Sequence, residues 1–257
     1  MSIYDEKPWL KMYDQGVPEN ASFTDETLLD IFEDTCNRYA EKVGFVSLGY
    51  EMTFGEIKDQ AYRLAACLAA MGIQKGDKVA IHLPNVLHLV ISYYAIMKIG
   101  AQAVMNNPLY TPPELEHQFN DSESKIVITV DFFGNTILDV RLNTGVKQII
   151  CICLKDYLPE GADTSAILTA PPREEADVYF WKDLMGKYNP DPPAVKIGLD
   201  DVCQLQYTGG TTGLSKGAML THRNLAAQLF QIDAWYPHRT RGDGGTQIGA
   251  IPFFHVY

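Results

Sequence analysis

The stretch Tyr207–Leu225, YTGGTTGLSKGAMLTHRNL, decides how the rest of this sequence is interpreted. Its part from Tyr207 to Gly217 contains four glycines, three threonines, one serine and one lysine. Because glycine has no Cβ atom and accepts positive φ angles, several backbone N–H groups of such a loop can turn toward one point. Hydroxyl groups and a lysine ammonium at the same point add hydrogen-bond donors and a positive charge. This composition predicts a polyphosphate-binding loop.

Two common phosphate-binding motifs do not fit the loop. The Walker A motif requires G-x-x-x-x-G-K-[ST], but five positions after Gly210 the chain has Ser215, and Gly217 follows Lys216. The dinucleotide-binding fingerprint begins with G-x-G, which the loop does not contain. Both motifs therefore fail, and the glycine content alone also fits a glycine-rich surface turn.

The segment 207–224 resembles the signature loop of the adenylate-forming (AMP-binding) enzymes, a superfamily of acyl- and aryl-CoA synthetases, luciferases and peptide-synthetase adenylation domains. It is most similar to the loop of bacterial and archaeal long-chain fatty-acid–CoA ligases (acyl-CoA synthetases). Much of that family has proline before the lysine, where this chain has Ser215. The resemblance covers essentially the whole chain and implies the N-terminal part of the acyl-CoA synthetase-like fold.

The composition excludes several classes of function. The 257 residues, 46% of them hydrophobic, can bury the core of one large α/β domain or two smaller ones. A formal net charge of −11 argues against a nucleic-acid partner, so an anionic nucleotide must be attracted by local donors and by Lys216. No apolar segment is long enough for a transmembrane span, and the start MSIYDEKPW lacks the apolar core of a secretory signal.

The cysteines indicate a reducing compartment. They are five, scattered, and without a C-x-x-C pair. Disulfides are rare in the cytosol, where isolated thiols usually serve packing. We therefore expect a cytoplasmic protein with structural thiols.

Strand-like and helix-like segments alternate along residues 27–154. Apolar residues at helical spacing predict helices over 27–41, 53–72 and 86–99. Thr53 with Glu56, and Thr111 with Glu114, have the spacing of helix capping boxes. Short apolar runs predict strands at 45–48, 78–83, 101–105, 125–130 and 147–154, with a helix between the last two. This alternation indicates an α/β fold, a parallel sheet with helices on both faces.

The chain is predicted to have four parts. Residues 1–26 form an N-terminal arm, and residues 27–154 form an α/β subdomain. Residues 155–199 contain six of the fourteen prolines, which predicts a long connection with one short helix near Val178–Met185. Residues 200–257 hold the glycine loop and begin a further, incomplete subdomain, with strands at 202–206, 218–220 and 247–251 and a helix at 224–235.

The resemblance implies that the loop binds ATP. The threonine and serine hydroxyls would contact the β- and γ-phosphates, and the glycines would let the backbone approach them. Lys216 would balance the charge of pyrophosphate, and Thr208 would contact Mg²⁺. The implied nucleotide-binding residues are Tyr207, Thr208, Gly209, Gly210, Thr211, Thr212, Gly213, Leu214, Ser215, Lys216, Gly217 and Ala218.

A second candidate site is Pro252–Tyr257, PFFHVY. A lone histidine beside aromatic residues is most often a packed core residue. The family, however, carries a P-x-x-H element at this position, where the histidine lies beside the acyl carboxylate and the adenylate. The resemblance therefore implies that His255 and Val256 bind the substrate, and that His255 acts with Thr208 and Lys216 in catalysis by positioning rather than by proton transfer.

Two further segments allow two interpretations each. Asn107–Ser122, NPLYTPPELEHQFNDS, predicts a turn and a capped helix of structural use. It also resembles a segment of long-chain fatty-acid–CoA ligases, with Pro113 in place of the usual basic residue, and so informs the subfamily more than catalysis. The apolar residues of the helix expected at 224–235 either belong to the core or line an acyl tunnel.

The resemblance implies a two-step reaction. A long-chain fatty acid and ATP give acyl-AMP and pyrophosphate, and the thiol of CoA then displaces AMP. The family's adenine site, ribose site, hinge and catalytic-lysine domain would follow Tyr257. This chain is therefore expected to be the N-terminal part of a larger ligase and to be inactive alone.

Other functions fit the same loop. A fatty-acyl-AMP ligase and a medium-chain acyl-CoA synthetase would both carry it, and so would a nucleotide-binding regulatory fragment that never catalyses. The sequence also leaves open the acyl length, the formation of a homodimer, and peripheral contact with the inner face of the membrane.

Overall fold

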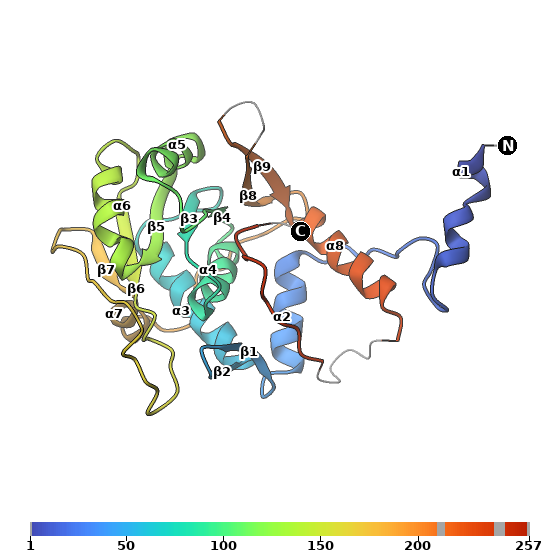
Figure 1. The fold of residues 1–257 in the computed structure, drawn as a ribbon, viewed down its shortest axis with the longest axis horizontal. Coiled ribbons are helices and arrows are strands. Elements are labelled where there is room, and N and C mark those ends of the chain that lie inside the picture. Colours follow the sequence, from blue (N-terminus) through green and yellow to red (C-terminus); the bar gives the residue numbers. More distant parts are fainter. Residues whose placement is uncertain (1, 210–213, 239–244, 256–257) are drawn as a thin grey trace.

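A seven-stranded sheet forms the centre of the computed structural model, which describes residues 2–209, 214–238 and 245–255 (Figure 1). The strands are β3 (Lys78–His82), β4 (Gln102–Met105), β5 (Ser124–Val130), β6 (Gln148–Ile152), β7 (Val178–Phe180), β8 (Val202–Thr208) and β9 (Lys216–Thr221). Their order is β7-β6-β5-β3-β4-β8-β9. All neighbouring strands are parallel except β8 and β9, which are antiparallel. The α/β fold with a mostly parallel sheet is confirmed.

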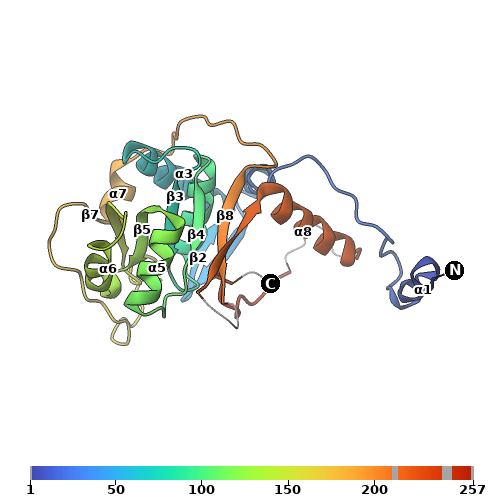
Figure 2. The same ribbon diagram turned by 90° about the horizontal axis from the view of Figure 1, so that it is seen from above.

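Helices cover both faces of this sheet. The helices of the structure are α1 (Ile3–Glu6), α2 (Leu28–Arg38), α3 (Phe54–Ala70), α4 (Leu87–Lys98), α5 (Pro112–Ser122), α6 (Gly134–Arg141), α7 (Trp181–Lys187) and α8 (His222–Trp235), with short 3-10 turns at η1 (Pro8–Met12) and η2 (Asp131–Phe133). Helix α1 belongs to the N-terminal arm and lies away from the sheet (Figure 1). Figure 2 shows α3 and α7 on one side of the sheet and α5 and α6 on the other. A separate hairpin, β1 (Val43–Ser47) and β2 (Tyr50–Thr53), lies against the α3 side.

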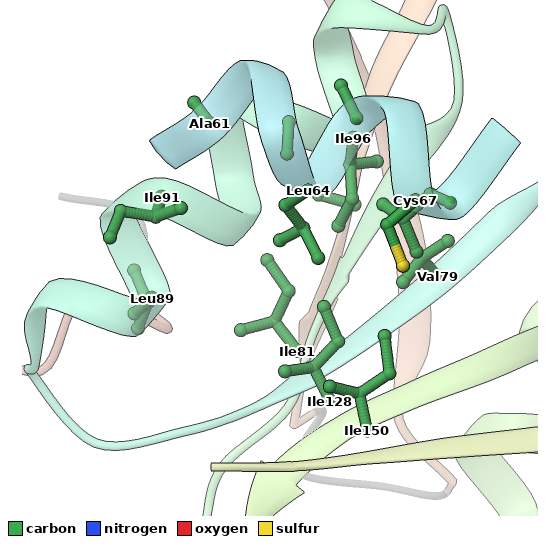
Figure 3. Close-up of a cluster of buried hydrophobic side chains, with 14 of the residues drawn as sticks. Ala61, Leu64, Cys67, Val79, Ile81, Leu89, Ile91, Ile96, Ile128 and Ile150 are labelled. Carbon is green, nitrogen blue, oxygen red and sulfur yellow. The ribbon is translucent and has the colours of Figure 1, made fainter. Parts of the chain in front are cut away.

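The alternation of side chains along the strands produces two cores. In β3, Val79 and Ile81 join the core under α2, α3, α4 and α7, whereas Ala80 joins the core under α5 and α6. Figure 3 shows Leu64 of α3 above Ile81, with Ile128 of β5 beside it. Parallel strands covered on both faces are apolar throughout, and α4 is buried almost all round, as its sequence predicts.

The predicted helix starts are confirmed. At Thr53 the backbone N–H donates to Glu56 at 2.8 Å, and the Glu56 N–H donates back to the Thr53 hydroxyl at 3.2 Å. The Thr111–Glu114 box has the same reciprocal arrangement. Since each box satisfies two N–H groups that the helix cannot, these sequence signals fix where α3 and α5 begin.

The connection 155–199 contains one element that the sequence analysis missed. Its expected short helix is α7, but the three residues before it form β7, which pairs with β6. Three residues are too few for a periodic signal, so only the pairing partner defines this strand. Because β7 and β8 both belong to the central sheet, hydrogen bonds connect the predicted parts of the chain. The four-part division stays a proposal.

The strand expected at 247–251 is wrong. These residues have no regular secondary structure, and their carbonyl groups bond to a side chain instead of a neighbouring strand. Figure 1 shows this C-terminal segment, drawn in red, passing between α4 and α2. Its apolar residues line a cavity there, which explains a strand-like sequence without a strand.

The amino-terminal arm carries two short helical turns and reaches α8. The ring of Tyr13 meets the ring of Trp235 edge-on at 5.0 Å, and Phe23 meets Phe230 at 6.5 Å. No helix among the described residues has both the length and the apolar character needed to cross a bilayer.

The hairpin of β8 and β9 forms the base of the glycine loop. Tyr207 pairs with Gly217, and Thr208 pairs with Lys216. The Tyr207 ring lies close over Gly217, so that a Cβ atom there would come within 3.0 Å of the ring. The Tyr207 hydroxyl donates to the Asp121 carboxylate of α5 at 2.6 Å, which prevents the ring from moving aside.

We predict that Gly217→Ala destabilises the protein by about 1–3 kcal/mol, because the added methyl group overpacks against a ring that is held in place. Gly145→Ala is the matched control, since nothing lies within 4 Å of a Cβ atom at that position. Urea denaturation measures both variants. Equal losses of stability in the Gly217→Ala and Gly145→Ala variants would show that a methyl group at position 217 does not clash with the Tyr207 ring.

His82, at the end of β3, makes stability depend on pH. Its Nδ1 lies 2.8 Å from the Thr129 hydroxyl, and burial lowers its pKa from 6.5 to about 4. As the pH falls, His82 is therefore protonated in the unfolded chain before it is protonated in the folded protein. The contribution of neutral His82 to stability is complete above pH 6.5 and is lost as the pH falls toward about 4.

We predict that His82→Gln flattens the pH dependence of the unfolding free energy between these two pH values. One proton bound only by the unfolded state gives a slope of at most about 1.4 kcal/mol per pH unit. His88 and His222, whose pKa values burial also lowers, contribute equally to both proteins. Denaturant titrations at several pH values measure the slopes, and identical slopes would contradict the assignment.

Candidate functional site

The carboxyl ends of β3, β4 and β8 lie together at one edge of the sheet. These three strands are adjacent and parallel, so the residues that follow each of them meet there. The chain also changes direction at this point, because β4 lies on one side of β3 and β5 on the other. Open α/β sheets bind ligands in the crevice outside such a switch point. The glycine loop begins at this edge, directly after β8.

The described part of the loop presents donors to solvent. Thr208, Gly209 and Lys216 are exposed, and Ser215 is half-buried. An added Cβ atom at Gly209 would meet nothing within 4 Å, so a ligand can reach the backbone there. Lys216 forms no ion pair with any carboxylate that the structure describes. Its charge is therefore available to an anion.

Several predicted site residues lie outside the described part of the chain. They are Gly210, Thr211, Thr212, Gly213 and Val256. Of the remaining loop residues, Leu214 and Ala218 are exposed, whereas the side chain of Tyr207 is buried on the α5 side of the sheet. Tyr207 therefore supports the loop, and only its backbone can face a nucleotide.

Helix α5 holds both ends of the loop. Asp121 accepts the bond from Tyr207 before the loop, and His117 Nε2 donates to the Ser215 carbonyl at its far end, at 3.0 Å. The two α5 residues are four positions apart and so share one face of the helix. The Tyr207 pKa is raised, first by burial and then by Asp121, so its hydroxyl keeps its proton and remains a donor.

The sequence analysis assigned Asn107–Ser122 mainly to structure and missed this contact. The apolar pattern of Leu115 and Phe119 marks only the buried stripe of α5. The partners of His117 and Asp121 lie 98 and 86 residues further along the chain, which no local pattern can reveal. The only available signal for this contact was the spacing of four between the polar residues His117 and Asp121.

An apolar cavity of about 700 Å³ lies beside β8. Its walls come from α2, α4, α8, the β1–β2 hairpin and the segment 247–255. The described residues of its lining include Ile31, Phe32, Leu89, Tyr93, Tyr94, Gln204, Leu229, Ile248, Ile251, Phe253 and His255. A volume of this size is within the usual range of small-molecule sites. Leu229 of α8 thus faces the cavity, in line with the acyl-tunnel interpretation of that helix.

A row of polar side chains along β8 connects the cavity with the loop. Tyr93 of α4 donates to Gln204 at 2.6 Å, Gln204 donates to Gln206 at 2.8 Å, and Gln206 donates to the Phe254 carbonyl at 2.8 Å. By strand alternation Thr208 continues the same side of β8. One face of a single strand therefore runs from the cavity to the base of the glycine loop.

His255 lies at the cavity wall, as its predicted role requires. Its side chain is exposed, its ring lies 4.6 Å from that of Phe254, and its N–H donates to the Pro252 carbonyl at 3.0 Å. The structure thus places the histidine near Gln206, at the end of the polar row from which β8 continues to Thr208. The geometry suits an elongated ligand with a polar head.

The described residues provide part of a cation site at most. Among them no group of three or more histidine, cysteine, aspartate or glutamate side chains could hold a metal ion. Thr208 offers a single hydroxyl, whereas protein-bound Mg²⁺ usually takes one or two carboxylates together with phosphate oxygens. Thr208 therefore fits a Mg²⁺ that is bound mainly by a nucleotide.

Comparisons with known proteins show the family of this chain. The sequence family described as AMP-binding enzyme matches residues 32–257. The long-chain-fatty-acid–CoA ligase of Bacillus subtilis (strain 168) is 35% identical over 99% of this chain and 47% of its own length. The ligase of the same name from Escherichia coli O6:H1 is 35% identical over 98% of this chain and 46% of its own. The crystal structure of a long-chain-fatty-acid-CoA ligase (FadD1) from Archaeoglobus fulgidus has a TM-score of 0.72 and 27% identity, covering 95% of this chain and 45% of that chain.

These relatives also define the extent of the match. The chain spans about half the length of the curated relatives it matches. Within that half the similarity is continuous, which confirms the resemblance inferred from the glycine loop and the acyl-CoA synthetase-like fold. The chain belongs to the AMP-binding enzyme family.

Proposed function

We propose that this chain is the N-terminal part of a long-chain-fatty-acid–CoA ligase, which activates a fatty acid with ATP and transfers the acyl group to CoA. One observation carries the proposal. One face of β8 begins at Gln204, in the wall of a large apolar cavity, and ends at the exposed Thr208–Lys216 pair. A phosphate-binding loop and an apolar chain site then share one strand, as joining ATP to a fatty acid requires.

In the first step, an oxygen of the fatty carboxylate attacks the α-phosphorus of ATP. A carbonyl–oxygen–phosphorus bond forms, the bond between the α-phosphorus and the bridging oxygen breaks, and pyrophosphate leaves with its electron pair. Carboxylate and triphosphate repel each other, so the site must neutralise charge and hold the two groups in line. The hydroxyls of Thr208 and Ser215, the backbone at Gly209 and the ammonium of Lys216 serve this purpose. Mg²⁺ would add Lewis-acid stabilisation of the phosphates.

His255 positions the fatty acid in this proposal. Lying at the cavity wall next to the polar end of β8, it meets the carboxylate end of a chain whose tail fills the cavity. In the second step the CoA thiolate attacks the acyl carbon and AMP leaves. The residues for adenine, ribose and CoA are proposed to follow Tyr257, as is a carboxylate ligand of Mg²⁺.

We predict that Lys216→Ala in the full-length protein lowers the rate of acyl-AMP formation on the order of a hundredfold, because a positioned charge donor is lost from the transition state. Pyrophosphate release with ATP and palmitate measures the rate. Lys216→Arg keeps the charge and should retain more activity. Lys182→Ala, on α7 at the other end of the sheet, is the control and should retain full activity.

Unchanged turnover and ATP dependence in Lys216→Ala would remove this lysine from the mechanism. Thioester formation across fatty-acid chain lengths separates a long-chain ligase from a medium-chain synthetase. A protein that forms acyl-AMP but no thioester would instead be a fatty-acyl-AMP ligase.

We also predict that residues 1–257 alone release no measurable pyrophosphate with ATP and palmitate, since the adenine and lysine sites are proposed to lie beyond them. The full-length protein, assayed in parallel, is the positive control. Robust release from the shorter chain would contradict this division of the site. A full-length protein that binds ATP without turning it over would favour a regulatory nucleotide-binding role.

A further inference from the structure

The segment 247–254 holds its place without belonging to any helix or strand. It supplies one wall of the cavity and leads directly into His255. An irregular segment keeps its position only if other groups bind its backbone N–H and C=O groups. The groups that do so here are the carboxamides of two side chains, Asn85 and Gln206.

We propose that Asn85 is a positioning residue for the fatty acid. By fastening this segment to the end of β3, Asn85 sets the width of the acyl cavity and the place of His255. The proposal rests on the proposed function, because it names the substrate that the fastened segment contacts. Asn85 itself is not in the cavity lining, so it acts through the segment that it holds.

The Asn85 carboxamide makes three hydrogen bonds to the segment. Its Nδ2 donates to the carbonyls of Gly249 at 3.0 Å and Ile251 at 2.8 Å. Its Oδ1 accepts the N–H of Phe253 at 2.7 Å. A single side chain thus binds three alternate residues, so the backbone of the segment curves around the Asn85 carboxamide. We call these three bonds the Asn85 latch.

The latch connects two walls of the cavity. Asn85 lies between β3 and the first residue of α4, and α4 contributes Leu89, Val90, Tyr93 and Tyr94 to one wall. The latched segment contributes Ile248, Ile251 and Phe253 to the other. The distance between the walls is therefore fixed by a contact at their common end.

The position of Phe253 shows how closely the latched segment is packed. A Cβ atom at Gly249 would come within 2.6 Å of the Phe253 ring, so the segment folds tightly upon itself. The Phe253 ring also meets that of Phe45 edge-on at 6.0 Å. Release of the Phe253 N–H would let this ring leave the cavity wall and carry the next residues with it.

Gln206 binds the next residue of the latched segment, Phe254. Its bond to the Phe254 carbonyl comes from β8, whereas Phe253 is bound by Asn85 in the connection between β3 and α4, so two different parts of the fold bind the consecutive residues 253 and 254. His255 follows immediately. Two carboxamides therefore bind the residues directly before His255 and help to set its position relative to Thr208, at the end of β8.

Only a carboxamide can make the latch, because the three bonds require two N–H donors and one acceptor oxygen on the same side chain. Aspartate at position 85 would still accept the Phe253 N–H, but it would place a negative charge against the carbonyls of Gly249 and Ile251. Alanine would make none of the three bonds. The two substitutions therefore separate the donor half of the latch from the acceptor half.

The test uses the full-length protein with Asn85→Ala and Asn85→Asp. We expect both variants to raise the KM for palmitate about tenfold or more while the KM for ATP stays within about twofold. Asn135→Ala is the matched control, since the Asn135 carboxamide accepts the N–H of Arg173 in a contact away from the cavity. It should change neither constant.

Hydrogen exchange at the Phe253 amide tests the latch without any reference to activity. Protection of this amide should be lost in Asn85→Ala and kept in Asn85→Asp. Thermal melting of both variants checks that they fold. Unchanged protection in Asn85→Ala would show that the latch does not hold the segment and would overturn the proposal.

Kinetics and exchange together also distinguish this proposal from the proposed function. If Phe253 loses protection but the KM for palmitate does not change, or if the KM for ATP rises equally, the positioning role is overturned in an active ligase. If the wild-type protein activates no fatty acid, the proposed function fails and the assignment to the fatty acid fails with it. The exchange result would still report whether Asn85 fastens the segment.

Discussion

The parallel pairing of β8 with β4 is the constraint on which the whole site depends. Its register places Gln204 beside Ala103 and Gln206 beside Met105. That register directs Gln204 and Gln206 to the cavity side of the sheet, and Leu205 and Tyr207 to the α5 side. A slip of one residue would exchange the two sets and bury the carboxamides among apolar side chains. The glycine loop and the cavity are therefore correctly placed together or not at all.

The buried carboxamides of β8 connect parts of the chain that are far apart in sequence. Gln204 and Gln206 are only 4% and 5% exposed, and a buried amide without a partner costs roughly 1–3 kcal/mol. Their bonds to Tyr93 and to the Phe254 carbonyl avoid this cost. The same bonds join α4, β8 and the segment that carries His255. Satisfying buried polar groups and assembling the site are thus one structural requirement.

The sequence predicts local features of this molecule well. The α/β class follows from alternating periodicities, and the starts of α3 and α5 follow from capping boxes. The binding role of the Thr208–Lys216 region stays a prediction from its glycines and hydroxyls. What it does not predict depends on distant partners. Asn85 and Phe253 are 168 residues apart, and β7 is a strand only because β6 lies beside it. The apolar residues at 247–251 resemble a strand in sequence, but their carbonyl groups bond to the side chain of Asn85, which is more than 160 residues away in sequence.

The charge of the protein explains why the cavity is lined as it is. With 32 acidic and 21 basic residues, the chain repels anions on average, and both proposed substrates, ATP and a fatty carboxylate, are anions. Among the described residues that line the cavity there is no aspartate or glutamate; its polar groups are hydroxyls, neutral carboxamides and His255. The acidic Asp121 is used on the opposite side of the sheet, where it holds Tyr207. The cavity side of β8 thus offers an anion hydroxyls, carboxamides and His255 as its described polar groups, whereas Asp121 lies on the other side of the strand.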